Sequence, residues 1–253
     1  MPKYPPPSIL TSFVYLDAFL RQRDQHEYHI RDWVLDSGAY SAHNSGKSID
    51  LQEFIDTALR LLEEDPTLTE VFGLDVIGDW EATNKNVEEM WRQGVPAIPT
   101  YHIGEPEEYL LHIAKEYPKI ALGGVARMPA GPRIEWARQC FHRVWPTRIH
   151  GFGFGGKKDM ISLPWDSVDS ASWEMKPGVF GIWHSYNNAP LKIRGTGQDL
   201  RVEVEHFLEL EHRARIRWTK TLREEFGEDY PGPTFRFVDV GSGRGPKAFR
   251  RMD

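Results

Sequence analysis

The chain has a single cysteine, Cys140, among its 253 residues. A disulfide framework and a cysteine-based zinc site within the chain are therefore both excluded. No apolar run approaches the roughly 20 residues that a membrane-spanning helix needs. Residues 1–7 also lack the apolar core of a signal peptide. We therefore expect a cytoplasmic protein that has no membrane partner.

An excess of positive charge is also missing. The formal net charge of −6 argues against bulk affinity for nucleic acid, although it is compatible with a local basic groove. Hydrophobic residues make up 40% of the chain and charged residues 27%, which is typical of a soluble globular protein. A chain of this length can form one α/β barrel.

Short apolar segments alternate with helical patterns at intervals of roughly 25 residues, a rhythm that predicts a parallel sheet. The expected strands are residues 8–16, 33–36, 71–76, 95–100, 119–122, 148–152 and 165–169. The expected helices are one that opens at residues 48–50, followed by 84–93, 106–116, 132–145 and 202–226, whereas residues 17–31 are expected to be irregular.

This pattern predicts a (β/α)8 barrel of the TIM type in a single domain over residues 1–253. Residues 1–7 would form an N-terminal arm, and residues 199–253 a helical extension with a basic tail. For the eighth strand, residues 179–183 are the first choice and residues 235–238 the alternative.

Several expected strands end on residues that can do chemistry. Asp36, Asp75 and Asp169 supply carboxyl groups and His102 an imidazole, whereas residues 123–124 are glycines. Because ligands bind at the carboxyl ends of parallel strands, we expect these residues to line one pocket. Taken alone, Asp36 could equally cap a turn or the next helix.

Five motifs occur in the order found in the queuine/guanine transglycosylase family. The sequence LDSGAY (35–40) resembles the Asp-Ser-Gly-Gly-Phe signature, and LGGV (122–125) resembles the Gly-Gly-Leu motif that contacts the base. Asp75 lies where those enzymes place a base-recognising aspartate. HGFGFG (150–155) resembles the Met-Gly-Val-Gly turn, and SVDS (167–170) matches the position of the nucleophilic aspartate. The resemblance runs from about residue 35 to residue 173.

Three departures from the family pattern refine the resemblance. The cysteine-rich zinc motif of the tRNA enzymes is absent, and the chain is much shorter than those enzymes. Both features are closer to the short relatives in bacteriophages that resemble DNA-guanine transglycosylases, which would act in the host cytoplasm. His102 replaces the family's usual glutamine, which leaves base selectivity open.

The resemblance implies exchange of guanine in nucleic acid, DNA rather than tRNA, for a 7-deazaguanine base. Asp169 would be the nucleophile of a covalent glycosyl intermediate, with Asp36 as general acid–base and no cofactor or metal. The implied substrate-binding residues are Asp75, His102, Gly123, Gly124, Ser37, Gly38 and Tyr40. The implied nucleic-acid-binding residues are Gly153, Gly155, Lys157 and Lys158. Tyr40, Tyr101 or Phe154 could stack on a base that has left the helix.

Four alternatives remain at this stage. Asp166 could be the reactive carboxylate in place of Asp169. His102 and His150 could instead join Asp36 and Asp75 around a metal, as in barrel hydrolases. The Gly-Gly-Lys-Lys run at 155–158 could be an ordinary loop. The protein could also be a catalytically silent relative that binds nucleic acid, as a homodimer or with a partner subunit.

Overall fold

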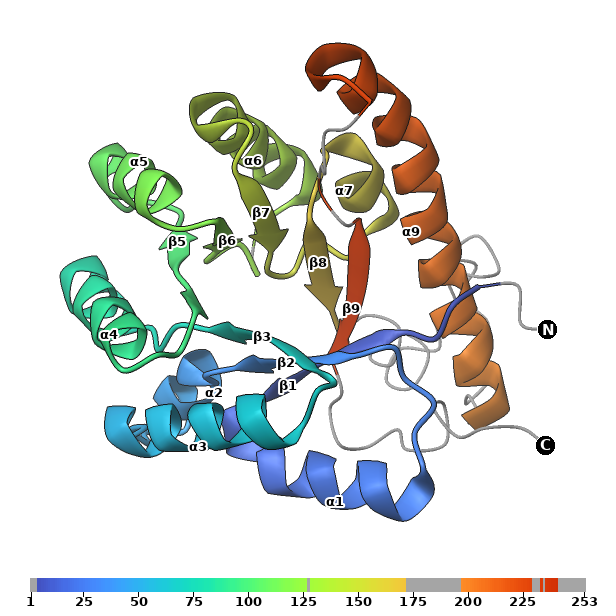
Figure 1. The fold of residues 1–253 in the computed structure, drawn as a ribbon. Coiled ribbons are helices and arrows are strands. Elements are labelled where there is room, and N and C mark those ends of the chain that lie inside the picture. The colour runs from blue at the N-terminus through green and yellow to red at the C-terminus, as the bar shows by residue number, and fades with distance from the viewer. Residues whose placement is uncertain (1–3, 127, 172–196, 229–232, 234, 241–253) are drawn as a thin grey trace.

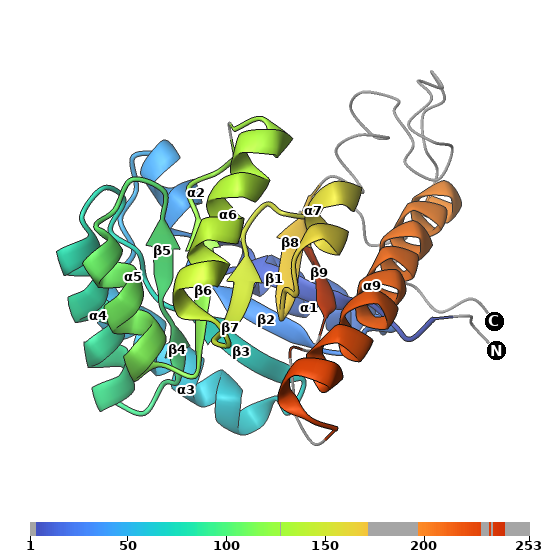
Figure 2. The same ribbon diagram turned by 90° about the horizontal axis from the view of Figure 1, so that it is seen from above.

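The computed structural model describes residues 4–126, 128–171, 197–228, 233 and 235–240 (Figure 1). This part of the chain has an α/β fold with one sheet, and all the paired strands of that sheet are parallel. The strand order is β4-β3-β2-β1-β9-β8-β7-β6-β5. The helices lie outside the strands in both views (Figures 1 and 2).

The strands are β1 (Ser8–Ser12), β2 (Trp33–Asp36), β3 (Leu68–Phe72), β4 (Ala97–Ile98), β5 (Thr100–His102), β6 (Lys119–Gly123), β7 (Arg148–Gly151), β8 (Ser167–Ser170) and β9 (Arg236–Val240). The helices are η1 (Phe13–Tyr15), α1 (Leu16–His26), α2 (Ala39–Asn44), α3 (Leu51–Glu64), α4 (Trp80–Arg92), α5 (Glu107–Glu116), α6 (Ala130–Val144), α7 (Lys157–Ser162) and α9 (Gly197–Phe226). No helix in the described ranges is both long enough and apolar enough to span a bilayer.

Alternation along the strands separates two apolar cores. On β2, Trp33 and Leu35 face the helices, whereas Val34 faces the interior of the curved sheet. The interior cluster consists of Leu10, Val34, Phe72, Ile98 and Ala121, with Phe152 packed against it. Side chains of successive strand residues point to opposite faces, so Asp36 shares the interior face with Val34.

The two strands at the ends of the sheet are neighbours in sequence. Only Pro99 separates β4 from β5, and a proline has no N–H with which to continue a ladder. The Pro99 carbonyl accepts a hydrogen bond from the Ala121 amide at 2.8 Å. The Ile98 carbonyl accepts one from Gly73 at 2.9 Å. One short interrupted segment therefore contacts both β3 and β6.

Contacts across the interior show that the sheet is strongly curved. Lys119 on β6 reaches Glu70 on β3 with an Nζ–Oε1 distance of 2.8 Å. The rings of Phe72 on β3 and His150 on β7 lie 4.6 Å apart. These strands are far from one another in the sheet order, so the sheet bends until its inner side chains touch.

A layer of buried ion pairs fills the interior at the amino ends of the strands. Lys119 Nζ contacts Asp166 Oδ2 at 2.6 Å as well as Glu70. Arg236 contacts Glu70 at 2.5 Å and Asp32 at 3.2 Å. Since each buried charge faces a partner of opposite sign, the layer avoids the large cost of an isolated charge.

Most elements lie where the sequence predicts them. The helix expected to open at residues 48–50 is α3, and its N-cap is Asp50, whose carboxylate accepts from the Glu53 amide at 2.9 Å. Residues 17–31 were wrongly expected to be irregular, because α1 occupies most of them and buries Leu16 and Phe19. The strand expected over 71–76 ends at Phe72, so Asp75 lies in the loop that follows.

The eighth expected strand is formed at the alternative segment, residues 235–238. β9 pairs with both β8 and β1, and its first residues are those of the alternative segment 235–238. The first choice, residues 179–183, lies outside the described residues, as does the basic tail after Val240. The expected helix over 202–226 is confirmed as part of α9.

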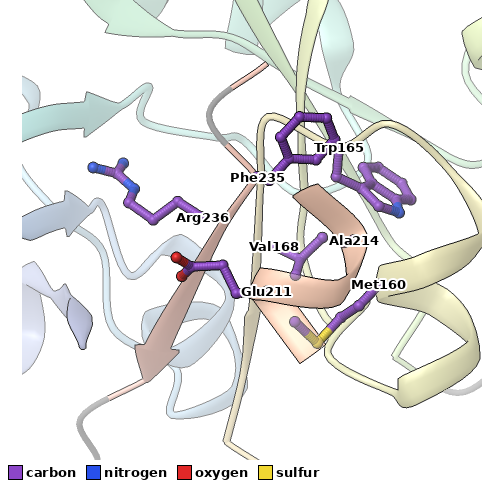
Figure 3. A pocket seen from close by; sticks show the side chains of 7 residues that line it. All are labelled: Met160, Trp165, Val168, Glu211, Ala214, Phe235 and Arg236. Atoms are coloured by element: carbon purple, nitrogen blue, oxygen red, sulfur yellow. The ribbon is translucent and has the colours of Figure 1, made fainter. Parts of the chain in front are cut away.

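Helix α9 packs against α7 and β9 on the outside of the sheet (Figure 2). A cavity of about 10 Å³ lies beneath it (Figure 3). Its lining residues are Met160, Trp165, Val168, Glu211, Ala214, Phe235 and Arg236. A volume of this order has room for about one water molecule. The cavity is therefore a packing gap between helix and sheet.

The ion-pair layer predicts a large stability loss on neutralising Asp166. The substitution Asp166→Asn removes one of the two carboxylate partners of buried Lys119 and a carboxylate partner of Arg148, whose side chain is 42% exposed. We expect a loss of about 3–5 kcal/mol in the free energy of unfolding, measured by urea denaturation. The control Glu64→Gln breaks an exposed pair with Arg60 and should cost less than about 1 kcal/mol. Equal losses in the two variants would contradict this account.

Candidate active site

Asp36 ends β2 and turns into the interior. Its Oδ2 accepts a hydrogen bond from the Gly38 amide at 3.0 Å. Gly38 has a φ of +77° and is the N-cap of α2, and a Cβ there would lie 2.2 Å from the Ser12 hydroxyl. The capping interpretation of Asp36 is therefore correct. Asp36 caps the turn that precedes α2, and the N-cap of the helix itself is Gly38.

Two other carboxyls act on Asp36. Burial, the charge of Asp75 and the charge of Asp169 together raise the pKa of Asp36 to about 7. The amides of Ser37 and Gly38 oppose this rise in pKa by donating to the carboxylate. Asp36 therefore exchanges a proton near neutral pH, which is what a general acid–base group requires.

Asp75, in the loop after β3, and His102, the last residue of β5, form an ion pair beside Asp36. The distance from His102 Nε2 to Asp75 Oδ2 is 3.4 Å. Glu105 contacts the same histidine twice, at 3.1 Å to Nδ1 and 2.7 Å to the backbone amide. Burial alone would lower the pKa of His102, but Asp75 and Glu105 outweigh it and raise the pKa to about 10. His102 is therefore an imidazolium cation at neutral pH.

The second oxygen of Asp75 has no partner among the described residues. Oδ1 is buried and accepts no hydrogen bond. A buried carboxylate oxygen that lacks a donor is costly unless a ligand supplies one. The ion pair with His102 holds the carboxylate in place, so Asp75 presents a fixed acceptor to an N–H or O–H group of a ligand.

Asp169 lies on the inner face of β8. Its Oδ1 accepts from the Gly153 amide at 2.8 Å and lies 3.4 Å from His150 Nε2. Gly153 has a φ of +76°, and a Cβ on Gly155 would lie 2.0 Å from the Ser170 Cβ. These glycines are thus needed to shape the loop around Asp169. The amide of Gly153, expected to bind nucleic acid, is already occupied by that carboxylate.

Asp166 lies at the opposite ends of the strands and is fully occupied. Arg148 binds both of its oxygens, at 2.9 and 3.1 Å, and Lys119 binds it at 2.6 Å. Burial acts to raise the pKa of Asp166, but the charges of Lys119 and Arg148 outweigh it and lower the pKa. This carboxylate is a structural ion-pair partner, which disfavours the alternative that Asp166 is the reactive group.

The remaining predicted residues divide between pocket and core. Gly123 and Gly124 end β6 beside His102, where a Cβ on Gly123 would lie 3.0 Å from the imidazole Cδ2. Ser37 is buried, and its hydroxyl accepts from the Ala39 amide at 3.4 Å within the turn. Lys157 and Lys158 are exposed at the start of α7.

The aromatic candidates behave differently from one another. Phe154 is completely buried and packs on Trp165 at 4.6 Å, so the expectation that it stacks on a base is wrong. Tyr101 is also buried, and its hydroxyl donates to the Glu105 carbonyl at 2.9 Å. Tyr40, on α2 and four residues after Asp36 in the chain, is 56% exposed. Of these three aromatic residues, Tyr40 is the one that is not buried.

The metal alternative gains no support from the geometry. Over the ranges that the structure describes, no group of three or more histidine, cysteine or acidic side chains is arranged to hold a metal ion. His102 is held between two carboxylates, and His150 contacts Ser167 and Asp169. Both rings thus have polar partners within the protein, and His150 Nε2 lies 3.4 Å from Asp169 Oδ1 without a hydrogen bond.

Comparison of the chain with protein-family models, curated proteins and solved structures finds no match. The functional assignment therefore depends on the geometry of the chain itself. That geometry is a set of carboxyl groups at the carboxyl ends of β2, β3 and β8, one of them with a pKa near neutrality and one with an unpaired buried oxygen.

Sequence reasoning missed Glu105 at this site. The available signal was the spacing His102-x-x-Glu105 directly after a strand, which brings the two side chains together across a tight turn. The Glu105 amide donates to the His102 carbonyl at 3.1 Å within that turn. A carboxylate so placed converts a neutral imidazole into a cation.

We expect the pKa of Asp36 to depend on Asp75. Replacement by Asn in Asp75→Asn removes a negative neighbour, so ionising Asp36 becomes easier and its pKa falls below about 7. A 13C NMR titration of the Asp36 carboxyl measures this change. The control Asp56→Asn alters an exposed helix residue and should leave the pKa of Asp36 unchanged. An unchanged value in Asp75→Asn would show that the two carboxyls are not coupled.

His102 makes stability depend on pH in the alkaline range. Its folded-state pKa, about 10, exceeds the ordinary value of 6.5, so its contribution is fully present below pH 6.5. Between these two values the contribution falls by about 1.4 kcal/mol per pH unit, and it is lost as pH rises through the folded pKa. Urea unfolding should therefore show wild type losing more stability than His102→Gln between pH 7 and pH 10. Parallel curves would contradict the cationic state.

Proposed function

We propose that the protein is a guanine transglycosylase that exchanges guanine in nucleic acid, with DNA favoured, for a 7-deazaguanine base. The observation that carries the proposal is the carboxyl cluster of Asp36, Asp75 and Asp169. Base exchange on one face of a sugar takes two displacements, which need a carboxylate nucleophile and a second carboxyl that carries a proton. A pKa near 7 suits Asp36 to the second role.

The proposed reaction uses the residues as follows. An oxygen of Asp169 forms a bond to C1′ of the nucleotide while the C1′–N9 bond breaks and its electron pair goes to guanine. Asp36 gives its proton to the departing base. The incoming base then loses a proton to Asp36 as its nitrogen attacks C1′ and releases Asp169. Atoms and charges balance over the cycle without any cofactor.

A closed (β/α)8 barrel is the finer form of the fold that we propose. Its support is the segment Ala97–His102, which pairs with β3 through β4 and with β6 through β5. The ion pair between Glu70 and Lys119 then lies inside the barrel. Closure would place all carboxyl ends of the strands around one opening, as catalytic sites in such barrels require.

Recognition of the base falls to Asp75 in this proposal. Guanine offers two neighbouring donors, the ring N–H and the amino group, on its Watson–Crick edge. The unpaired Oδ1 of Asp75 matches such a donor. The target base would leave the stack to enter the site, and the ring of Tyr40, which is exposed, would pack on it or on a neighbour.

A catalytically silent nucleic-acid-binding relative is the competing function. It would have no use for a carboxyl whose pKa is raised to about 7 by burial and by two other carboxyls, since these effects cost stability. Proton exchange at Asp36 therefore favours the enzyme. An assay that offers both DNA and tRNA as substrates distinguishes between them.

The test is base exchange on DNA and on tRNA that carry radiolabelled guanine. Without an incoming base, wild type should form a covalent protein–nucleic-acid adduct, and Asp169→Asn should form none. Asp36→Asn should slow exchange by roughly 10²–10⁴-fold. Because Asp36 must carry a proton to the departing base, the rate should fall as pH rises above about 7. Asp56→Asn serves as the control, and a fully active Asp169→Asn would refute the proposal.

A further inference from the structure

A buried chain of polar groups leads from Lys119 to Asp169 through the interior. Lys119 Nζ lies 2.9 Å from Ser167 Oγ, and Ser167 Oγ lies 2.8 Å from His150 Nδ1. His150 Nε2 lies 3.4 Å from Asp169 Oδ1. His150 and Ser167 are completely buried, so water cannot substitute for these contacts.

The direction of each hydrogen bond follows from donor counting. An ammonium group has three N–H donors and no acceptor. Lys119 faces three acceptors, which are Glu70 at 2.8 Å, Asp166 at 2.6 Å and Ser167 at 2.9 Å. Ser167 therefore accepts from Lys119, and its own O–H is left to donate. The acceptor within reach of that O–H is His150 Nδ1.

This direction fixes the protonation of the imidazole. A ring nitrogen that accepts a hydrogen bond carries no proton, so the neutral ring has its proton on Nε2. The rings of Phe72 and Phe152, each 4.6 Å away, surround the imidazole with apolar groups. Burial and the charge of Lys119 outweigh the charges of Asp169 and Glu70 and lower the pKa of His150, which agrees with a neutral ring.

The Nε2–H group is buried and needs an acceptor. Asp169 Oδ1, at 3.4 Å, is the acceptor that the described residues place before it. That distance is long for a hydrogen bond, and such contacts often tighten when a substrate enters. The Gly153 amide donates to the same Oδ1 at 2.8 Å. Two donors therefore converge on Oδ1 of Asp169, and neither of them contacts Oδ2.

We propose that His150 is a positioning residue that donates from Nε2 to Oδ1 of Asp169 and leaves Oδ2 as the oxygen that attacks C1′. This inference rests on the proposed function for its kinetic consequence but not for its hydrogen bonds. Two fixed donors on Oδ1 hold the carboxylate in one orientation, so Oδ2 does not have to be ordered during the reaction.

The ring protonation can be measured without any activity. In 15N-labelled protein at pH 7, the His150 signals are identified by their loss in His150→Gln. We expect an unprotonated Nδ1 and a protonated Nε2. Ser167→Ala removes the donor to Nδ1 and should give a mixture of tautomers, and Asp169→Ala should shift the Nε2–H signal. A protonated Nδ1 in wild type, or an Nε2–H signal indifferent to Asp169→Ala, would overturn the inference.

The kinetic consequence is tested with a pair of matched variants. His150→Leu removes the donor, and loss of a hydrogen bond to a charged group should lower kcat for exchange by about 10- to 100-fold with little change in KM. His150→Gln keeps an N–H near the position of Nε2 and should restore most of the rate. If His150→Leu does not fold, Ser167→Ala replaces it, with a smaller expected loss in kcat. Equal rates in His150→Leu and His150→Gln would overturn the positioning role.

The two proposals fail in different ways. A wild-type protein that exchanges no base on DNA or tRNA refutes the proposed function, whereas the NMR result still decides the direction of the hydrogen bonds. Conversely, normal exchange together with a protonated Nδ1 refutes the role of His150 alone.

Discussion

The Lys119 ammonium group is the contact on which the interior depends. It lies 4% exposed inside the curved sheet and joins Glu70 on β3 to Asp166 and Ser167 at the start of β8. No apolar side chain could connect these strands in the same way, because only a cation satisfies two buried carboxylates at once. Removing either carboxylate would leave the buried ammonium group with one carboxylate partner in place of two, which we expect to destabilise the fold.

Lys119 also links the layer of buried ion pairs to the candidate site, through Ser167 and His150. Carboxylates lie at both ends of the interior. At the amino ends of the strands they are paired with cations, and at the carboxyl ends Asp75 and Asp169 repel the negative charge of Asp36. The apolar cluster around Phe72 separates the two layers. The ion-pair layer stabilises the fold, whereas burial together with the charges of Asp75 and Asp169 raises the pKa of Asp36 to about 7.

The sequence was sufficient for the parallel strand pattern and for the carboxyls at strand ends, because both depend on local periodicity. It could not reveal the pairing of Asp166 with Lys119 and Arg148, whose side chains meet only after the sheet curves. Helix α1 was missed because its apolar residues are few, although Leu16 and Phe19 already have helical spacing. β9 lies beside β8 in the sheet but comes after helix α9 in the chain, so its place between β8 and β1 is set by long-range pairing.

Three residues of spacing separate the ion-pair partner Asp166 from the proposed nucleophile Asp169. Both are acidic, both adjoin or lie on β8, and both are nearly inaccessible. Asp166 meets two cations, whereas Asp169 meets an amide and an imidazole that the structure keeps neutral. A carboxylate neutralised by cations is a poor nucleophile, since its charge is already stabilised. A carboxylate that is held by neutral donors is not neutralised, so its negative charge stays available for attack on the sugar carbon. This difference makes β8 the strand around which the proposed chemistry is built.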